Sequence, residues 1–234
     1  MRIKPVRSGD LREIFYDEEH WRLLHDLRCI AIRVMEVLER SGLKTVLHGS
    51  LARGDVHAQS DIDILIPYPV PSYKVEIALD RLKVKPFARF IVQATPSHAI
   101  KAHIEVDEKI TVTFPLVKLR KLEREFYRFG GEVTLEELRS DIRTPGISKK
   151  LLLIIPTSKG HLEVPIVGRE AEAAKIVGVS VDIVKERVRV LMRRDEIGRT
   201  GIYLKYPLSP EESFEEAFKK IVERDPAVRR RLKL

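Results

Sequence analysis

The sequence is poor in residues that oxidise or deamidate. Of its 234 residues one is cysteine, Cys29, none is asparagine, and the two glutamines are Gln59 and Gln93. A single cysteine forms no disulfide within the chain, which excludes the disulfide-rich secreted class and favours a reducing cytoplasm. The shortage of amides beside abundant charge indicates a thermophilic source. Because Cys29 stands in an apolar stretch with helical periodicity, we expect it to be a buried small residue rather than a nucleophile.

Long apolar runs are also missing. Runs such as 62–71 and 151–156 are far shorter than the roughly 20 residues that span a bilayer, and the N-terminus has no signal-peptide pattern. The chain is 44% hydrophobic and 33% charged, which excludes a wholly disordered protein. Its 43 Lys+Arg against 35 Asp+Glu give a net charge of +8. This excess favours an anionic partner: nucleic acid, a nucleotide or a membrane surface.

Hydrophobic periodicity divides the chain into two parts. In the first part the expected helices are 17–41, 73–82 and 116–129, and the expected strands are 44–48, 62–66, 87–94, 99–106 and 110–114. Past Gly131 we expect a short helix at 135–142, a hinge at 144–146, a hairpin of 151–155 with 161–167, two helices, and a helical tail over 211–234. The sequence therefore predicts an α+β (α/β-like) domain at residues 1–143 and a second domain at 144–234.

The most informative stretch is His48–Ile66, HGSLARGDVHAQSDIDILI. A strand runs into Gly49-Ser50 and then directly into a helical segment, and a helix start that follows a glycine is suited to binding a triphosphate. Asp61 and Asp63 stand two residues apart on the next strand, so both carboxylates face the same side while Ile62 and its alternating neighbours face the core. Paired carboxylates beside a phosphate site are typical of Mg²⁺ binding.

This phrase resembles the hallmark of the DNA polymerase β nucleotidyltransferase superfamily: Gly-Ser, a spacer of about ten residues, then Asp-x-Asp. It is most similar to the small archaeal and bacterial members. The resemblance implies a small mixed sheet flanked by helices, metal binding by Asp61 and Asp63, and phosphate binding by Gly49 and Ser50. Arg53 either joins them at the β- and γ-phosphates or is a surface residue in a tight turn.

The resemblance also implies a third carboxylate on a neighbouring strand. Glu105 fits the local pattern, Asp107 is an alternative, and the strand 110–115 carries Thr111 and Thr113 where many relatives carry the acid. A complete site would bind two Mg²⁺ ions and an NTP and transfer a nucleoside monophosphate by in-line displacement at the α-phosphorus. Without the third acid, nucleotide binding is expected to persist without turnover.

Residues 170–206 resemble a winged helix-turn-helix domain. Two helices, 170–177 and 181–194, flank a turn at 178–180, and Ser180 is a good N-cap. A β-wing is expected at 197–206. The cations expected to contact nucleic acid are Lys185, Arg189, Arg193 and Arg199. The alternative is a packing or dimerisation module with a solvated basic face.

Three functions are compatible with this sequence. The first is a Mg²⁺-dependent nucleotidyltransferase with an unidentified acceptor. The second is a nucleic-acid-binding regulator whose nucleotidyltransferase domain only binds nucleotide. The third is the neutralising half of a toxin pair, which the extra C-terminal domain disfavours because such proteins are usually smaller.

Overall fold

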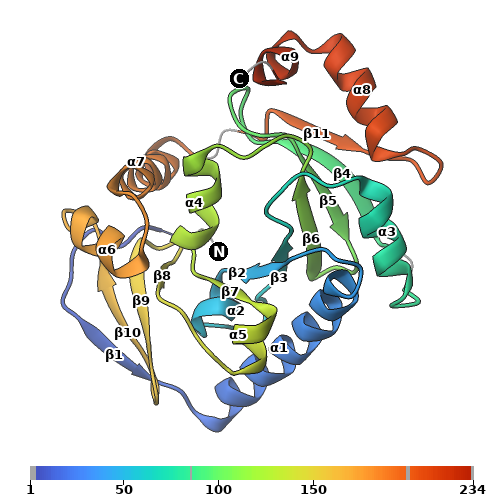
Figure 1. Ribbon diagram of the computed structural model, residues 1–234. Coiled ribbons are helices and arrows are strands. Elements are labelled where there is room, and N and C mark those ends of the chain that lie inside the picture. Colours follow the sequence, from blue (N-terminus) through green and yellow to red (C-terminus); the bar gives the residue numbers. More distant parts are fainter. Residues whose placement is uncertain (1–3, 85, 199–200, 233–234) are drawn as a thin grey trace. The chain divides into compact units, whose positions relative to one another are not determined.

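The computed structural model describes residues 4–84, 86–198 and 201–232. They form these elements in chain order (Figure 1): β1 (Arg12–Phe15), α1 (Glu18–Glu39), β2 (Val46–His48), α2 (Ser50–Arg53), β3 (Ile62–Leu65), α3 (Ser72–Asp80), β4 (Ala88–Gln93), β5 (Lys101–Glu105), β6 (Ile110–Pro115), α4 (Lys121–Phe129), β7 (Glu132–Thr134), α5 (Leu135–Arg139), β8 (Gly146–Ile147), β9 (Leu152–Thr157), β10 (Gly160–Pro165), α6 (Glu170–Val177), α7 (Val181–Ile197), β11 (Leu204–Pro207), α8 (Phe214–Arg224) and α9 (Pro226–Leu232).

The chain forms two compact units, and each is assembled from three separate segments. Unit 1 contains residues 1–32, 47–60 and 124–200, and unit 2 contains residues 33–46, 61–123 and 201–234. The units therefore alternate along the chain. The division into sequence domains at 143/144 is a different one, and it stays a prediction.

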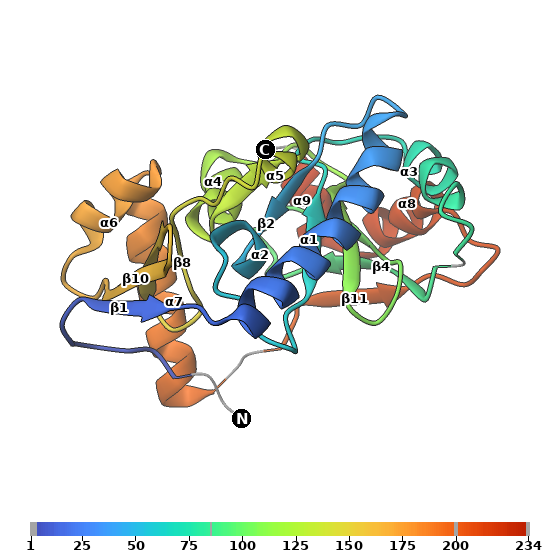
Figure 2. The ribbon, with the colours of Figure 1, turned by 90° about the horizontal axis from the view of Figure 1, so that it is seen from below.

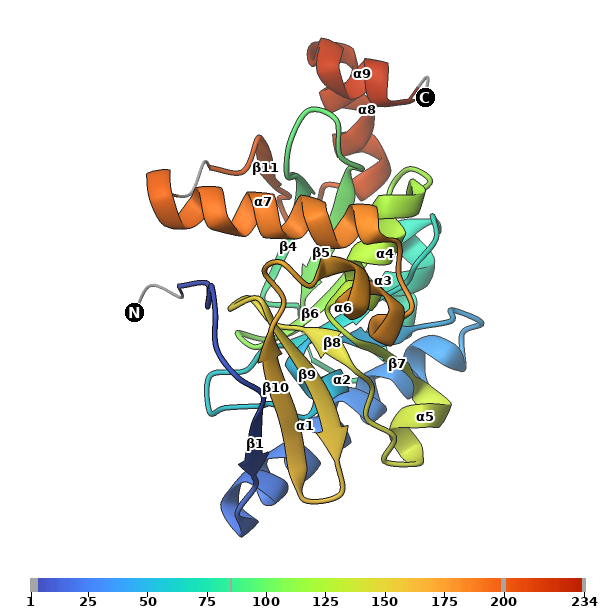
Figure 3. The same cartoon turned by 90° about the vertical axis from the view of Figure 1, so that its left-hand side faces the viewer.

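Unit 1 contains a four-stranded antiparallel sheet in the order β1-β10-β9-β8 (Figure 3). The hairpin of β9 and β10 was expected from the sequence, whereas β1 was not. Phe15 of β1 pairs with Gly160, whose φ is +158°. A Cβ at Gly160 would lie 1.9 Å from the carbonyl oxygen of Ile14, so only glycine permits this close approach of the two strands.

Unit 2 contains the strands β11, β4, β5, β6 and β3 as neighbours in that order. β3 is parallel to β6, while β11–β4, β4–β5 and β5–β6 are antiparallel. The mixed sheet expected from the sequence is thus present.

Side chains alternate between two faces of the unit 2 sheet. Ile62, Ile64, Val112 and Phe114 are buried on one face, and Phe114 packs edge-on against Phe214 of α8 with ring centroids 5.5 Å apart. The helix α3 lies next to α8 (Figure 2) and is tied to it by Ser72, whose amide and hydroxyl both donate to Glu215 at 2.7 Å. Helices therefore cover the apolar face of these strands.

The C-terminal third departs from the expected pattern. The tail, expected to be helical over 211–234, contains two helices, α8 and α9, because Asp225 leaves the helical conformation and Pro226 begins a new helix. The β-wing expected at 197–206 is wrong for the described residues: α7 continues to Ile197, and the strand that follows, β11, pairs with β4 instead of forming a hairpin. No helix among the described residues is both long and apolar enough to cross a membrane.

Candidate active site

The Gly-Ser turn follows β2 as expected. Gly49 has φ +90° and ψ −147°, and no atom lies within 4 Å of the position that a Cβ would take there. Its amide donates to the carbonyl of Gly131 at 2.9 Å, and its carbonyl accepts from the amides of Ala52 and Arg53. The positive φ is the backbone conformation for which glycine is needed, and the space in front of Gly49 suits the close approach of a ligand.

The hydroxyl of Ser50 contacts Ser60, the last residue of the spacer between Gly-Ser and Asp-x-Asp. It donates to Ser60 Oγ at 3.3 Å, and Ser60 Oγ also accepts from the amide of His57 at 3.0 Å. Ser60 is buried and directly precedes Asp61 in the chain. The contact of Ser50 with a phosphate stays a prediction, and forming it would exchange a long hydrogen bond for a charge-assisted one.

Arg53 is a buried residue, so its interpretation as a surface residue in a tight turn is wrong. Its Nη1 donates to the carbonyl of Gly130 at 2.5 Å, and its Nη2 forms an ion pair with Asp55 at 2.9 Å. The side chain is 7% exposed. Both terminal nitrogens thus bind within unit 1, and the predicted contact with phosphate is untested.

Arg28 of α1 holds the end of α2. Its Nε donates to the carbonyl of Leu51 at 3.0 Å, and its Nη2 donates to that of Ile142 at 2.8 Å. Burial lowers the pKa of Arg28 to about 10, so the side chain stays charged at neutral pH. Arg28 therefore satisfies the carbonyl of Leu51 in the short helix α2 and links this helix to the segment that follows α5.

The buried side chain of Arg28 determines the environment of the next residue, Cys29. Because Arg28 takes the buried position of this helical turn, its neighbour Cys29 is exposed. The expectation that Cys29 is a buried small residue is therefore wrong. Its sulfur lies 3.4 Å from His25 Nε2, also on the exposed side of α1.

The Asp-x-Asp pair lies in unit 2, on the face of the sheet opposite the apolar core. Asp61 is exposed just before β3, Asp63 is half-buried within it, and the intervening Ile62 is 1% exposed. The expected alternation is thus confirmed: Ile62, Ile64 and Ile66 are in the core. Both carboxylates belong to the other face of the strand.

The strand register places the candidate third acid. Asp63 on β3 is opposite Thr111 on β6, and Thr111 is in turn opposite Glu105 on β5. The three side chains share one face, but Asp63 and Glu105 are separated by two strand spacings, about 10 Å at the backbone. Among the described residues, no group of three or more His, Cys, Asp or Glu is arranged to hold a metal ion.

Asp107 belongs to the β5–β6 turn. Its Oδ1 accepts from the amides of Lys109 and Ile110 at 2.7 and 2.8 Å. The carboxylate therefore stabilises the turn that joins the antiparallel strands β5 and β6. Glu105 is the remaining acid on the face of Asp63 in this part of the sheet.

The donors that are present suit one hard cation. Asp61 and Asp63 offer carboxylate oxygens, and Thr111 offers a hydroxyl on the adjacent strand. Mg²⁺ at nucleotide sites typically binds one or two carboxylates together with substrate phosphates. The residues therefore fit a magnesium ion that is bound together with a triphosphate.

Sequence reasoning missed the basic groups on the same face of β5. Lys101 and His103 alternate with the buried Ala102 and Ile104, and Lys205 of β11 faces the same side. Burial, and then the charges of Lys101 and Lys205, lower the pKa of His103 to about 4, so the imidazole is neutral at pH 7. The two-residue alternation in Lys-Ala-His-Ile-Glu was the signal that predicts this placement.

The predicted nucleic-acid contacts lie on α7 of unit 1. Lys185, Arg189 and Arg193 are exposed on this helix, as expected, and Arg199 lies outside the described residues. Ser180 precedes α7 but does not cap it, because its hydroxyl donates to Glu125 instead. The role of the exposed cations is untested.

One comparison with known proteins is positive. Residues 32–130 match the sequence model of the nucleotidyltransferase domain family. This match indicates transfer of a nucleoside monophosphate in general, and it includes every residue of the Gly-Ser and Asp-x-Asp motif. The chain has no significant match among curated proteins or among solved structures.

Proposed function

We propose that the chain is a Mg²⁺-dependent nucleotidyltransferase that moves a nucleoside monophosphate from an NTP to an acceptor. The observation that carries the proposal is the polar face of the mixed sheet at β3, where Asp61 immediately precedes the strand and Asp63 lies within it, both inside the matched family segment. Asp61 and Asp63 would hold the ion, which when bound neutralises the triphosphate and the departing pyrophosphate. Gly49 and Ser50 bind the phosphates. Arg53 stabilises the turn that follows them through its bonds to Gly130 and Asp55.

Glu105 is our candidate for the third carboxylate. It shares a face with Asp63 and stands one strand beyond Thr111. The position suits an acid that supports a second ion or accepts the proton of the attacking hydroxyl. Two ions with Asp61, Asp63 and Glu105 as their protein ligands are the arrangement we propose for turnover.

A second function is favoured by the two-strand separation of Asp63 and Glu105. If this distance persists when nucleotide binds, the domain retains NTP without transferring it. The exposed cations of α7 would then make the chain a nucleic-acid-binding regulator that responds to nucleotide.

One experiment separates the two functions. The full chain is incubated with each α-labelled NTP, Mg²⁺ and cell extract, with a matched sample in EDTA. We expect the label to appear in an acceptor only with Mg²⁺, and the labelled species identifies that acceptor. Nucleotide binding without labelling of any species would contradict the enzyme and support the regulator.

A further inference from the structure

A second polar site lies in unit 2, where the segment that follows β6 meets α9. It is a pocket of about 320 Å³. Its lining residues are Val117, Lys118, Leu119, Arg120, Arg231 and Leu232. Three of these six side chains are cationic and three are apolar. None belongs to the Gly-Ser or Asp-x-Asp motif.

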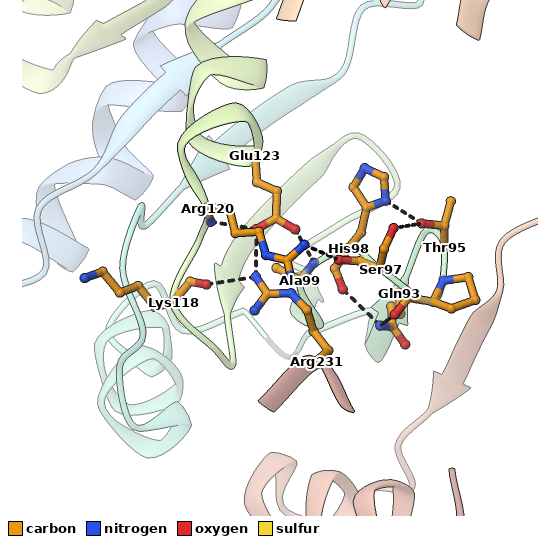
Figure 4. A network of polar contacts seen from close by, with 10 residues as sticks. Gln93, Thr95, Ser97, His98, Ala99, Lys118, Arg120, Glu123 and Arg231 are labelled. Atoms are coloured by element: carbon orange, nitrogen blue, oxygen red, sulfur yellow. Dashed lines mark hydrogen bonds and ion pairs between the residues drawn. The ribbon is translucent and has the colours of Figure 1, made fainter. Parts of the chain in front are cut away.

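Arg231 of α9 is the buried cation of this pocket, at 4% exposed. Its Nη2 donates to Glu123 Oε2 at 2.9 Å and to the carbonyl of Lys118 at 3.1 Å (Figure 4). Its Nε is buried and has no hydrogen-bond partner among the described residues. A buried guanidinium with an unsatisfied donor is costly unless an acceptor is supplied.

Glu123, the acid beside this pocket, already accepts three hydrogen bonds. It accepts from the amide of Ala99 at 2.6 Å, the amide of Arg120 at 2.7 Å and Arg231 Nη2 at 2.9 Å. Its side chain is 9% exposed, and its charge is balanced by that of Arg231. It therefore caps the start of α4 and leaves the charges of the other two lining cations uncompensated.

Those two cations, Lys118 and Arg120, are exposed at the pocket. The side chain of Arg120 makes a long contact, 3.5 Å from Nη1 to the carbonyl of Ser97. The loop that carries Ser97 is itself held by Gln93, whose Nε2 donates to the carbonyls of Pro96 and His98 (Figure 4). Arg120 therefore lies beside a loop that Gln93 holds by two hydrogen bonds.

We propose that this pocket binds a phosphate dianion. A guanidinium with a spare donor and two flanking cations match the charge and acceptor oxygens of phosphate. The dianion has two sources: inorganic phosphate, or the phosphate of a nucleoside monophosphate, whose organic part would contact Val117, Leu119 and Leu232. The proposal goes beyond the transfer reaction and does not depend on it.

The test measures the melting temperature of the full chain in phosphate, in AMP, and in sodium chloride of matched ionic strength. The variant K118A/R120A removes two exposed cations, so its fold should survive. The matched control K74A/R33A removes one lysine and one arginine that are exposed elsewhere in unit 2. We expect both ligands to raise the melting temperature of the parent and the control, and the affinity of K118A/R120A to fall about tenfold or more.

The two ligands distinguish the sources of the phosphate group. Tighter binding of AMP than of phosphate identifies an organic phosphate, and equal binding identifies the free ion. The variant D61A/D63A should retain the response, which separates this pocket from the proposed nucleotide site. Absence of any stabilisation beyond that of sodium chloride, or an equal response in K118A/R120A, would overturn the proposal.

Discussion

Asp63 and Thr111 lie opposite each other on the parallel strands β3 and β6. A hydroxyl thus occupies the position beside Asp63 from which the neighbouring strand would most directly supply another acid. The nearest carboxylate along this line is Glu105, one strand further. In the site that we propose, the carboxylates are therefore those of Asp61 and Asp63 and, one strand beyond Thr111, that of Glu105.

The first prediction concerns Asp61 and Asp63. The variant D61A/D63A should lose Mg²⁺-dependent nucleotide binding and transfer while it keeps its fold, because Ile62 and Ile64 still fill the core. Loss of two like charges should leave the melting temperature in metal-free buffer unchanged or raised. Transfer of labelled nucleotide and thermal unfolding check this, with D80A/E108A, two exposed acids of the same unit, as the control. Normal transfer by D61A/D63A would contradict the assignment.

The second prediction separates Glu105 from that pair. Glu105→Gln keeps the size of the side chain and removes its charge, so nucleotide binding should persist while turnover falls about tenfold or more. Single-turnover transfer and direct nucleotide binding are measured on the same preparation. Unaltered turnover in Glu105→Gln would show that the third carboxylate is not Glu105.

The third prediction concerns pH and His103. Its pKa is lowered to about 4 in the folded chain, whereas the unfolded value is about 6.5. Between these values the unfolded state binds the extra proton, so stability is full above about pH 6.5 and declines as the pH falls toward 4. The loss should reach at most about 3 kcal/mol.

Urea unfolding at pH 7 and pH 5 measures this effect. His103→Gln removes the titrating group, so its stability should change less between the two pH values than that of the parent chain. The exposed His25 on α1 supplies the control, and His25→Gln should behave like the parent. An equal pH dependence in His103→Gln would contradict the prediction.

The fourth prediction concerns the ion pair of Arg53 and Asp55. Arg53→Ala should destabilise the chain by about 3 kcal/mol, because it leaves the carboxylate of Asp55 enclosed without its partner. Removing both charges in R53A/D55A should cost less than the sum of the single changes. The exposed pair of Arg40 and Glu36 is the control, where Arg40→Ala should cost less than about 1 kcal/mol. Chemical denaturation of the parent, R53A, D55A and R53A/D55A gives the coupling energy of the pair. Strict additivity of the two single changes would contradict the prediction.

The fifth prediction concerns nucleic acid at α7. If Lys185 and Arg189 neutralise phosphates, K185A/R189A should lower the slope of log K against log salt by up to about 1.8. The full chain is required, because β10 pairs with β1 and β11 pairs with β4. A chain with K149A/K150A, which removes two exposed lysines of the same unit, controls for net charge. An unchanged slope would identify this face as an interaction or dimerisation surface.

The strongly periodic segments could be predicted from the sequence. The strands β3 and β5 lie within the expected ranges, and β6 extends one residue beyond its range, to Pro115. They could be predicted because buried apolar residues alternate there with polar residues over a complete strand. The helix α1 differs from its expected range by one or two residues at each end. The placement of Asp61 and Asp63 on one face follows from the same alternation.

The remaining features depend on contacts that are distant in sequence. β1 is a short, largely exposed strand whose partner lies some 145 residues later, so its four residues carry no periodic signal of their own. Burial of Arg28 depends on carbonyl groups of Leu51 and Ile142. By contrast, the sequence alone indicates the boundary between α8 and α9 at Pro226, because proline favours the first position of a helix.

The alternation of the two units along the chain affects how the protein is made. During synthesis β1 leaves the ribosome long before its partner β10, and β4 long before β11. At about 5–20 residues per second, the 145 residues between Phe15 and Gly160 take roughly 7–30 s to add. For that time β1 has no strand with which to pair, and β4 waits for β11 in the same way. The nascent chain is therefore exposed to mispairing well after the Gly-Ser and Asp-x-Asp motif has been translated.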